Sequence, residues 1–345
     1  IQNLRDDYLL EEFDWIIEGQ NCADLAGYLQ ANRTGRGLPF EEKLRSAVWQ
    51  LYTAYRDYLA NQNQRTWGQL RQLALAEVRN GNFGPRWDYV IVDEAQDLPP
   101  VALALCVELC RDPAGLFLTA DANQSLYNRG FRWQNVHAQL KVAGRTRILR
   151  RNYRSTREIG QASPELLAEA DGLDPEAVQQ TFVHVGPPPA IYAAGGAADQ
   201  ARWLATEIRQ AAQDLHLPIN AAAVLVPSNS LGQAFAELLT GHGLPAKFMS
   251  GKSIKLEERF VKVMTLHSAK GLEFPIVALA HVEADRLPKE TMTTDAQDIA
   301  EHHQAQRRLM YVGCTRAMRY LFVTHDRSIP SPFLQQLSED CWLWL

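Results

Sequence analysis

The stretch Tyr89-Val90-Ile91-Val92-Asp93-Glu94-Ala95-Gln96-Asp97 decides which fold we expect for this chain. Its four apolar residues predict a strand buried on both faces, and the acidic residues mark the end of that strand. A second apolar run at 116–118 also leads into an acidic segment. Further strands are predicted at 223–226, 261–264, 276–280 and 320–323, with helical patterns at 200–212 and 231–239. Strands that alternate with helices predict an α/β protein with parallel sheets, whose ligands bind beyond the carboxyl ends of the strands.

Residues 1–86 have a different pattern, which predicts helices. Leu9, Phe13 and Ile16 recur at helical spacing, and a longer apolar stripe runs from Leu44 to Leu59. This N-terminal helical region contains no motif that indicates chemistry by itself.

Length and composition indicate a two-domain globular protein. The chain has 345 residues, of which 46% are hydrophobic and 22% charged. No apolar run approaches the roughly 18–20 residues of a membrane span, so we expect no membrane partner. Five scattered cysteines favour reduced thiols and a cytoplasmic location. The net charge of −5 neither supports nor excludes a nucleic-acid partner, because a protein can hold a nucleic-acid strand in one local channel whatever its total charge.

Asp93 and Glu94 suit phosphoryl transfer from a nucleotide. Such a reaction needs Mg²⁺ on the phosphates and a group that orients the attacking water. We therefore expect Asp93 to hold the metal, with Glu94 beside it, and Glu94 to activate the water. The simpler alternative is an acidic turn at the end of a strand.

Four later segments complete an ordered series of motifs. They are Asp121–Tyr127, Arg151–Ser155, Thr265–Phe274 and Arg307–Arg316. Together with the segment at 93–97, this series resembles the superfamily 1 nucleic-acid helicases of the UvrD/Rep type.

The resemblance implies RecA-like parallel sheets flanked by helices, as in P-loop NTPases, with the first RecA-like domain incomplete. Residues 1–86 would be the helical insertion called 1B, residues 87–147 the C-terminal half of the first motor domain (1A), and residues 148–345 the second motor domain (2A) without a large 2B insertion. The Gly-rich phosphate loop would lie upstream of Ile1. Gly251-Lys252-Ser253 resembles the end of such a loop, but Ala246 stands where its first Gly is required.

The resemblance also assigns roles to individual residues. Glu94, Gln124, Arg154 and Arg316 would be catalytic, and Asp93 and Glu94 would bind Mg²⁺. Guanidinium groups such as those of Arg154 and Arg316 pair phosphate oxygens bidentately. Tyr153 would stack on the adenine of ATP, and Glu273 would bind the ribose. Contacts to the nucleic acid would come from Tyr127, Trp133, Thr265 and His267.

Some of these assignments have plain alternatives. Trp133 is equally well explained as a core or interface aromatic, and His267 as a buried structural histidine. The segment Asn128–Trp133 departs from the family pattern, and Ala305-Gln306 replaces the usual acidic pair before Arg307.

The expected function is that of an ATP-dependent DNA helicase or translocase. ATP would bind in the cleft between two RecA-like domains, and the motor would move along single-stranded DNA or at a junction of single and double strands. The 345 residues by themselves, without a phosphate loop, are expected to be inactive. The alternative is a non-catalytic, helicase-derived module that binds nucleic acid or protein.

Overall fold

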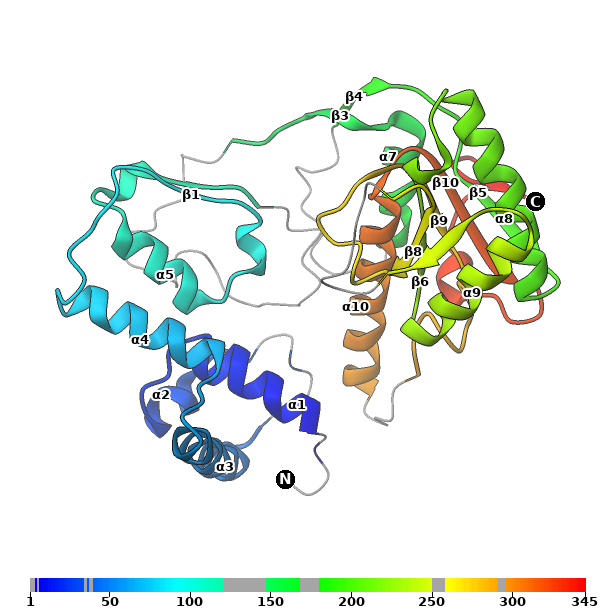
Figure 1. Cartoon of the computed structure of the whole chain (residues 1–345). Helices are drawn as coiled ribbons and strands as arrows, with labels where there is room; N and C mark the ends of the chain where they lie inside the picture. Colours follow the sequence, from blue (N-terminus) through cyan, green and yellow to red (C-terminus); the bar gives the residue numbers. More distant parts are fainter. Residues whose placement is uncertain are drawn as a thin grey trace. The chain divides into compact units, whose positions relative to one another are not determined.

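The computed structural model describes residues 4, 6–33, 36, 40–120, 147–167, 180–249, 258–290 and 296–345. The chain divides into two compact units, Ile1–Arg147 and Ile148–Leu345. Each unit has its own core, so each is described by itself (Figure 1).

The first unit begins with helices, as the apolar stripes predict. These are α1 (Asp6–Glu11), a π-helix η1 (Glu12–Glu18), α2 (Leu25–Gln30), α3 (Glu42–Asn61) and α4 (Trp67–Arg79). Phe13, Ile17, Tyr28 and Val48 form a common core. Helix α4 begins at a capping box, in which the side chains of Thr66 and Gln69 each bond the other's backbone N–H.

A two-stranded parallel sheet follows in the same unit. It consists of β1 (Val90–Val92) and β2 (Leu116–Leu118), joined through η2 (Ala95–Asp97), α5 (Pro100–Leu109) and η3 (Pro113–Gly115). Val92 of β1 and Leu103 of α5 share a core on one face of the sheet. On the other face, Ile91 and Phe117 are cross-strand partners and are 74% and 61% exposed.

The second unit contains a larger sheet and a separate two-stranded sheet. Its first elements are β3 (Arg151–Thr156), α7 (Arg157–Ala162), η5 (Ser163–Leu167), β4 (Thr181–His184), β5 (Ala190–Ala194), α8 (Ala197–Asp214), η7 (Ile219–Ala221) and β6 (Ala222–Val226). The remaining elements are α9 (Asn229–Gly241), β7 (Ala246–Phe248), β8 (Val261–Thr265), β9 (Phe274–Leu279), α10 (Ala296–Cys314), β10 (Ala317–Asp326), η9 (Pro332–Leu334) and β11 (Leu343–Trp344).

The larger sheet has seven strands in the order β11-β5-β10-β9-β6-β8-β7, and all its neighbouring strands are parallel. Helices α8 and α9 pack on one face, where Leu204 and Phe235 meet Val224 and Val263. Helix α10 packs against the opposite face (Figure 1), where a Cβ added at Gly313 would meet Leu225, Leu266 and Leu279. The sheet is thus covered on both faces, as the continuous apolar strands predict.

The predicted α/β class is confirmed, with differences at the level of single strands. Each of the six predicted strands is present, with bounds that shift by up to three residues. The strands β3, β4, β5, β7 and β11 were not predicted. Arg151–Thr156 has no apolar alternation, and Ala190–Ala194 is rich in alanine, so tertiary pairing rather than local propensity makes them strands. Among the residues described, no helix is long and apolar enough to cross a membrane.

Candidate nucleotide and nucleic-acid sites

Asp93 and Glu94 lie at the carboxyl end of β1, and the adjacent strand β2 fixes them there. The N–H of Thr119 donates to the carbonyl of Val92, and the N–H of Ala95 donates to the carbonyl of Thr119, each at 2.9 Å. The Thr119 hydroxyl donates to the Asp93 carboxylate. Both acidic residues are exposed, so a metal ion has access to them.

Glu94 adopts a backbone conformation that is rare for residues other than glycine. Its φ is 52° and its ψ is 41°, in the left-handed region. The amide of Gln96 donates to Glu94 Oε2 at 2.5 Å, and the N–H of Glu94 donates to Asp93 Oδ1 at 3.0 Å. These bonds orient each carboxylate within a tight turn, and carboxylate oxygens are the ligands that Mg²⁺ prefers.

Arg154 and Glu273 come together in the second unit, although more than a hundred residues separate their motifs, and Tyr153 is the chain neighbour of Arg154. Arg154 Nη2 lies 2.5 Å from Glu273 Oε1. The Tyr153 ring is 61% exposed, and the guanidinium of Arg151 lies over it at 5.2 Å. An exposed ring, a guanidinium and a carboxylate are the groups that a nucleotide base, a phosphate and a ribose would need.

Arg316 lies against the same segment, and its side chain is buried. The residue is 2% exposed, and its Nε donates to the carbonyl of Val312 at 3.0 Å. Its Nη1 donates to the carbonyl of Leu272 at 3.5 Å, and its own carbonyl accepts the N–H of Phe274 at 3.0 Å. Arg316 therefore contacts both chain neighbours of Glu273.

These residues lie at the amino edge of the large sheet. Phe274 begins β9, and Ala317, which follows Arg316, begins β10. The expectation that ligands lie beyond the carboxyl ends of strands therefore does not describe Glu273 and Arg316.

Thr265 and His267 lie at the opposite, carboxyl edge. Thr265 ends β8 and is buried, and its Oγ is 2.9 Å from the Ser268 hydroxyl. His267 is exposed, yet the surrounding protein atoms remove enough water from the imidazole to lower its pKa. A mostly neutral imidazole at pH 7 is suited to hydrogen bonds with sugars or bases rather than to fixed pairing with a phosphate.

Three predicted residues, Gln124, Tyr127 and Trp133, lie outside the described residues. Two residues that the sequence reasoning missed lie in the site. Thr119 orients Asp93, and Asn152 shapes the turn before Arg154. Their signals in the sequence were a hydroxyl directly after a strand and an Asn two positions before a functional Arg.

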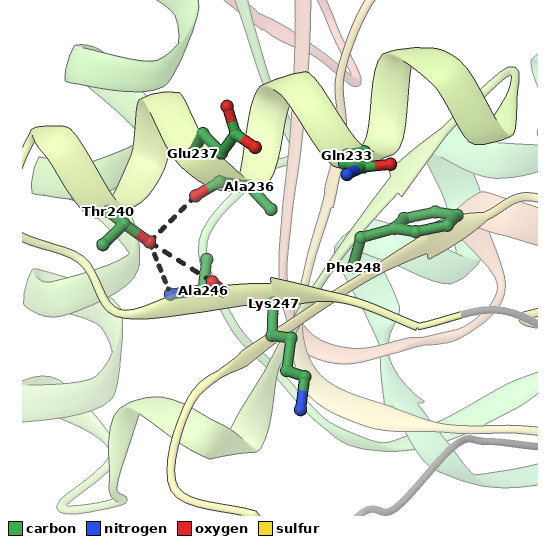
Figure 2. A pocket seen from close by; sticks show the side chains of 7 residues that line it. All are labelled: Gln233, Ala236, Glu237, Thr240, Ala246, Lys247 and Phe248. Atoms are coloured by element: carbon green, nitrogen blue, oxygen red, sulfur yellow. Dashed lines mark hydrogen bonds between the residues drawn. The ribbon is translucent and has the colours of Figure 1, made fainter.

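Other features of the described residues do not add to these sites. The residues that the structure describes contain no group of three or more His, Cys, Asp or Glu side chains placed to hold a metal ion. A hollow between α9 and the edge strand β7 is lined by Gln233, Glu237, Thr240, Lys247 and Phe248, with no predicted site residue among them (Figure 2).

The helix-covered parallel sheet defines the class of the second unit as α/β. Comparison with known families is more specific. A model of the UvrD-like helicase C-terminal domain matches residues 148–256 and 251–328, and a model of the UvrD/REP helicase N-terminal domain matches residues 13–145. The chain belongs to the UvrD-like helicase family.

Individual relatives match parts of the chain that differ in length. A probable DNA helicase of Mycoplasma pneumoniae is 25% identical over 283 residues, which are 78% of this chain and 50% of that protein. The ATP-dependent DNA helicase Rep of Buchnera aphidicola is 37% identical over 103 residues, 27% of this chain and 15% of that protein. DNA helicase II of Escherichia coli is 38% identical over 91 residues, 24% of this chain and 12% of that protein. The chain thus spans half or less of the lengths of these relatives.

The solved structures that match part of the chain include one helicase domain. The C-terminal domain of a possible DNA helicase from Lactobacillus plantarum is 18% identical with a TM-score of 0.42, and the match covers 56% of this chain and 98% of that one.

Proposed function

We propose that the chain is part of an ATP-dependent DNA helicase or translocase. In this proposal Asp93 holds Mg²⁺ with Glu94 beside it, and Glu94 orients and deprotonates the water that attacks the γ-phosphate. Arg154 and Arg316 neutralise the charge that develops on that phosphate. Gln124 would sense the phosphate from the first unit.

The observation that carries the proposal is the grouping of Arg154, Glu273 and Arg316 around the short segment 272–274. Arg154 pairs with Glu273, and Arg316 bonds the backbone of Leu272 and of Phe274, the chain neighbours of Glu273. These two arginines and the carboxylate come from three separate motifs. Tyr153 adds an exposed ring beside Arg154, which supports a role in stacking on the adenine. The identity of the nucleotide as ATP rests on the family.

Thr265 and His267 support a contact with single-stranded DNA at the other edge of the sheet. The imidazole of His267 and the hydroxyl groups of Thr265 and Ser268 offer hydrogen bonds to a single strand, and we propose that they do so without a preference for its base sequence. Stacking by Tyr127 and Trp133, a preference for junctions of single and double strands, and the predicted cytoplasmic location remain parts of this proposal.

Strand separation by the complete protein tests the proposed function. A labelled duplex with a single-stranded tail should be unwound only with Mg²⁺ and ATP, and single-stranded DNA should stimulate phosphate release. DNA binding without any stimulated hydrolysis would contradict the enzyme and favour the non-catalytic binding module.

A further inference from the structure

Strand β3 contains a bulge at the residues to which the proposed function assigns contacts with the nucleotide. Asn152 pairs with Phe182 and Thr156 pairs with His184. Three residues, 153 to 155, therefore face the single residue Val183 on β4. Bulges of this kind re-aim side chains and are frequent next to active sites.

The side chain of Asn152 closes this bulge. Its Oδ1 accepts the backbone N–H of Arg154 at 2.9 Å and that of Ser155 at 3.1 Å. Its Nδ2 donates to the Ser155 hydroxyl at 3.1 Å and to Gln180 Oε1 at 3.3 Å. Because two backbone donors meet one atom, that atom must be the amide oxygen.

The backbone of Arg154 is held from its other side as well. Arg319, near the start of β10, donates from Nη1 to the carbonyl of Arg154 at 2.7 Å. The N–H and the C=O of Arg154 are therefore both bonded to side chains. With its backbone fixed, the guanidinium reaches Glu273 Oε1 at 2.5 Å.

We propose that Asn152 is a positioning residue that sets the guanidinium of Arg154 for the phosphate of the nucleotide. The identity of that ligand rests on the proposed function, whereas the positioning rests on the bulge geometry. Alanine at 152 would leave two N–H groups of the bulge without their acceptor and let the turn relax. Aspartate would keep an acceptor at the same distance from the backbone, as in other Asx turns.

Labelling of arginines by a dicarbonyl reagent, phenylglyoxal, followed by peptide mass spectrometry, measures this positioning. In the complete protein without nucleotide, Asn152→Ala and Asn152→Gln should label Arg154 about two- to fivefold faster than the wild type, the range expected when an exposed ion pair is lost. Asn152→Asp should label at the wild-type rate. Glu273→Gln gives the rate for an unpaired Arg154, and Arg202, which is paired with Asp199, is the internal reference.

Two outcomes of the labelling experiment contradict the proposed positioning role of Asn152. An unchanged rate in both Asn152→Ala and Asn152→Gln would overturn the proposal, and so would Asn152→Asp labelling as fast as Asn152→Ala. If Asn152→Ala also accelerates Arg202, unfolding is responsible, and the comparison of Asn152→Gln with Asn152→Asp decides.

A second arm separates this inference from the proposed function. Millimolar MgATP should slow the labelling of Arg154 in the wild type and in Asn152→Asp, and less in Asn152→Gln. If MgATP protects Arg154 in no variant, the nucleotide contact of the proposed function is wrong, while the labelling without nucleotide still decides whether Asn152 positions Arg154.

Discussion

At the scale of single residues, the candidate sites depend on backbone arrangements that cost energy. Glu94 occupies the left-handed region at φ 52°, which costs an L-residue about 1–2 kcal/mol. The hydrogen bonds from Thr119 and Gln96 to the two carboxylates offset this cost. Arg316 carries a cost of another kind, because its charged guanidinium is buried and is bonded to backbone carbonyls.

The role of Glu94 is tested by Glu94→Gln in the complete protein. We expect ATP turnover to fall by about 10²–10⁴-fold while nucleotide affinity stays close to wild type, because only the step that needs a base is affected. Steady-state hydrolysis and nucleotide titration together measure both quantities. Turnover within threefold of wild type would exclude Glu94 as the general base.

The buried position of Arg316 predicts a double effect of Arg316→Ala. Loss of a transition-state cation should reduce hydrolysis far more than ATP binding. In addition, the carbonyl of Leu272 loses a donor and that of Val312 retains the hydroxyl of Thr315, and together with the lost packing of a buried side chain this should lower the free energy of unfolding by about 1–3 kcal/mol. Urea denaturation checks the second effect. The control is Arg202→Ala, which removes an exposed arginine and is expected to change the free energy of unfolding by less than about 0.5 kcal/mol. Equal stability of both variants would contradict the burial of Arg316.

At the scale of elements, short segments are tied by close backbone approaches and buried ion pairs. Gly115, directly before β2, lies against the backbone of Asp88, two residues before β1, because it has no side chain. In the helical part, the π-helix η1 carries Glu12, which is fully buried and bonded to Arg33 and Arg36.

Gly115→Ala should destabilise the first unit. The new Cβ would overlap the carbonyl oxygen of Asp88, and a backbone atom of that kind yields less easily than a side chain. We expect a loss of about 2–3 kcal/mol in the free energy of unfolding, measured by chemical denaturation. Gly84→Ala is the matched control, since a Cβ there meets nothing within 4 Å. Similar effects of the two substitutions would argue against the close approach of β2 to Asp88.

Glu12 should make the stability of the helical region depend on pH. Burial alone would raise the pKa of Glu12, but the hydrogen bond and charge of Arg33, with the charge of Arg36, outweigh it and hold the pKa below its usual range. Its contribution is therefore present above the unfolded-state pKa of about 4.3 and is lost as the pH falls through the lower folded-state pKa.

Denaturation of Glu12→Gln as a function of pH measures this contribution. The variant should lose about 3–5 kcal/mol at pH 7, as expected when one partner of a buried ion pair is removed, and the difference from wild type should shrink below about pH 4. Glu11→Gln, which removes an exposed partner of Arg36, should change little. A difference that is constant across this pH range would exclude the ionised carboxylate as the cause.

At the scale of the whole molecule, the proposed nucleotide binding would need groups that neutralise the phosphates. In the proposed function Asp93 and Glu94 would attract Mg²⁺ but repel a polyanion, and a phosphate loop would supply the backbone N–H groups and the lysine that neutralise it. Arg154, Glu273 and Arg316 belong to the other unit. Domain closure driven by contacts to the γ-phosphate is a known way in which two such units act together.

The 345 residues by themselves should bind ATP far more weakly than an intact relative and should show no significant ATPase or unwinding activity. They should still fold, because the second unit has a seven-stranded sheet with its own hydrophobic core. A fluorescent ATP analogue titrated with Mg²⁺, and phosphate release measured with single-stranded DNA, check both statements. Tight binding with DNA-stimulated release would contradict the prediction and direct attention to Gly251-Lys252-Ser253.

The sequence by itself determined the family, the α/β class and the position of the strands whose residues are continuously apolar. These features are local, because apolar runs such as that at 223–226 and motifs such as Asp93-Glu94 are read from adjacent residues. The predictions for Gln124, Tyr127 and Trp133 remain predictions on the same basis.

Only the tertiary structure decided how the distant motifs meet. It formed β3 from a polar segment, brought Arg154 within 2.5 Å of Glu273, and buried Arg316 against Leu272 at the amino edge of the sheet. The physical reason is that strand pairing, bulges and burial depend on partners far away in the chain. Asn152 pairs with Phe182 directly before the bulge, and no pattern of neighbouring residues specifies that register.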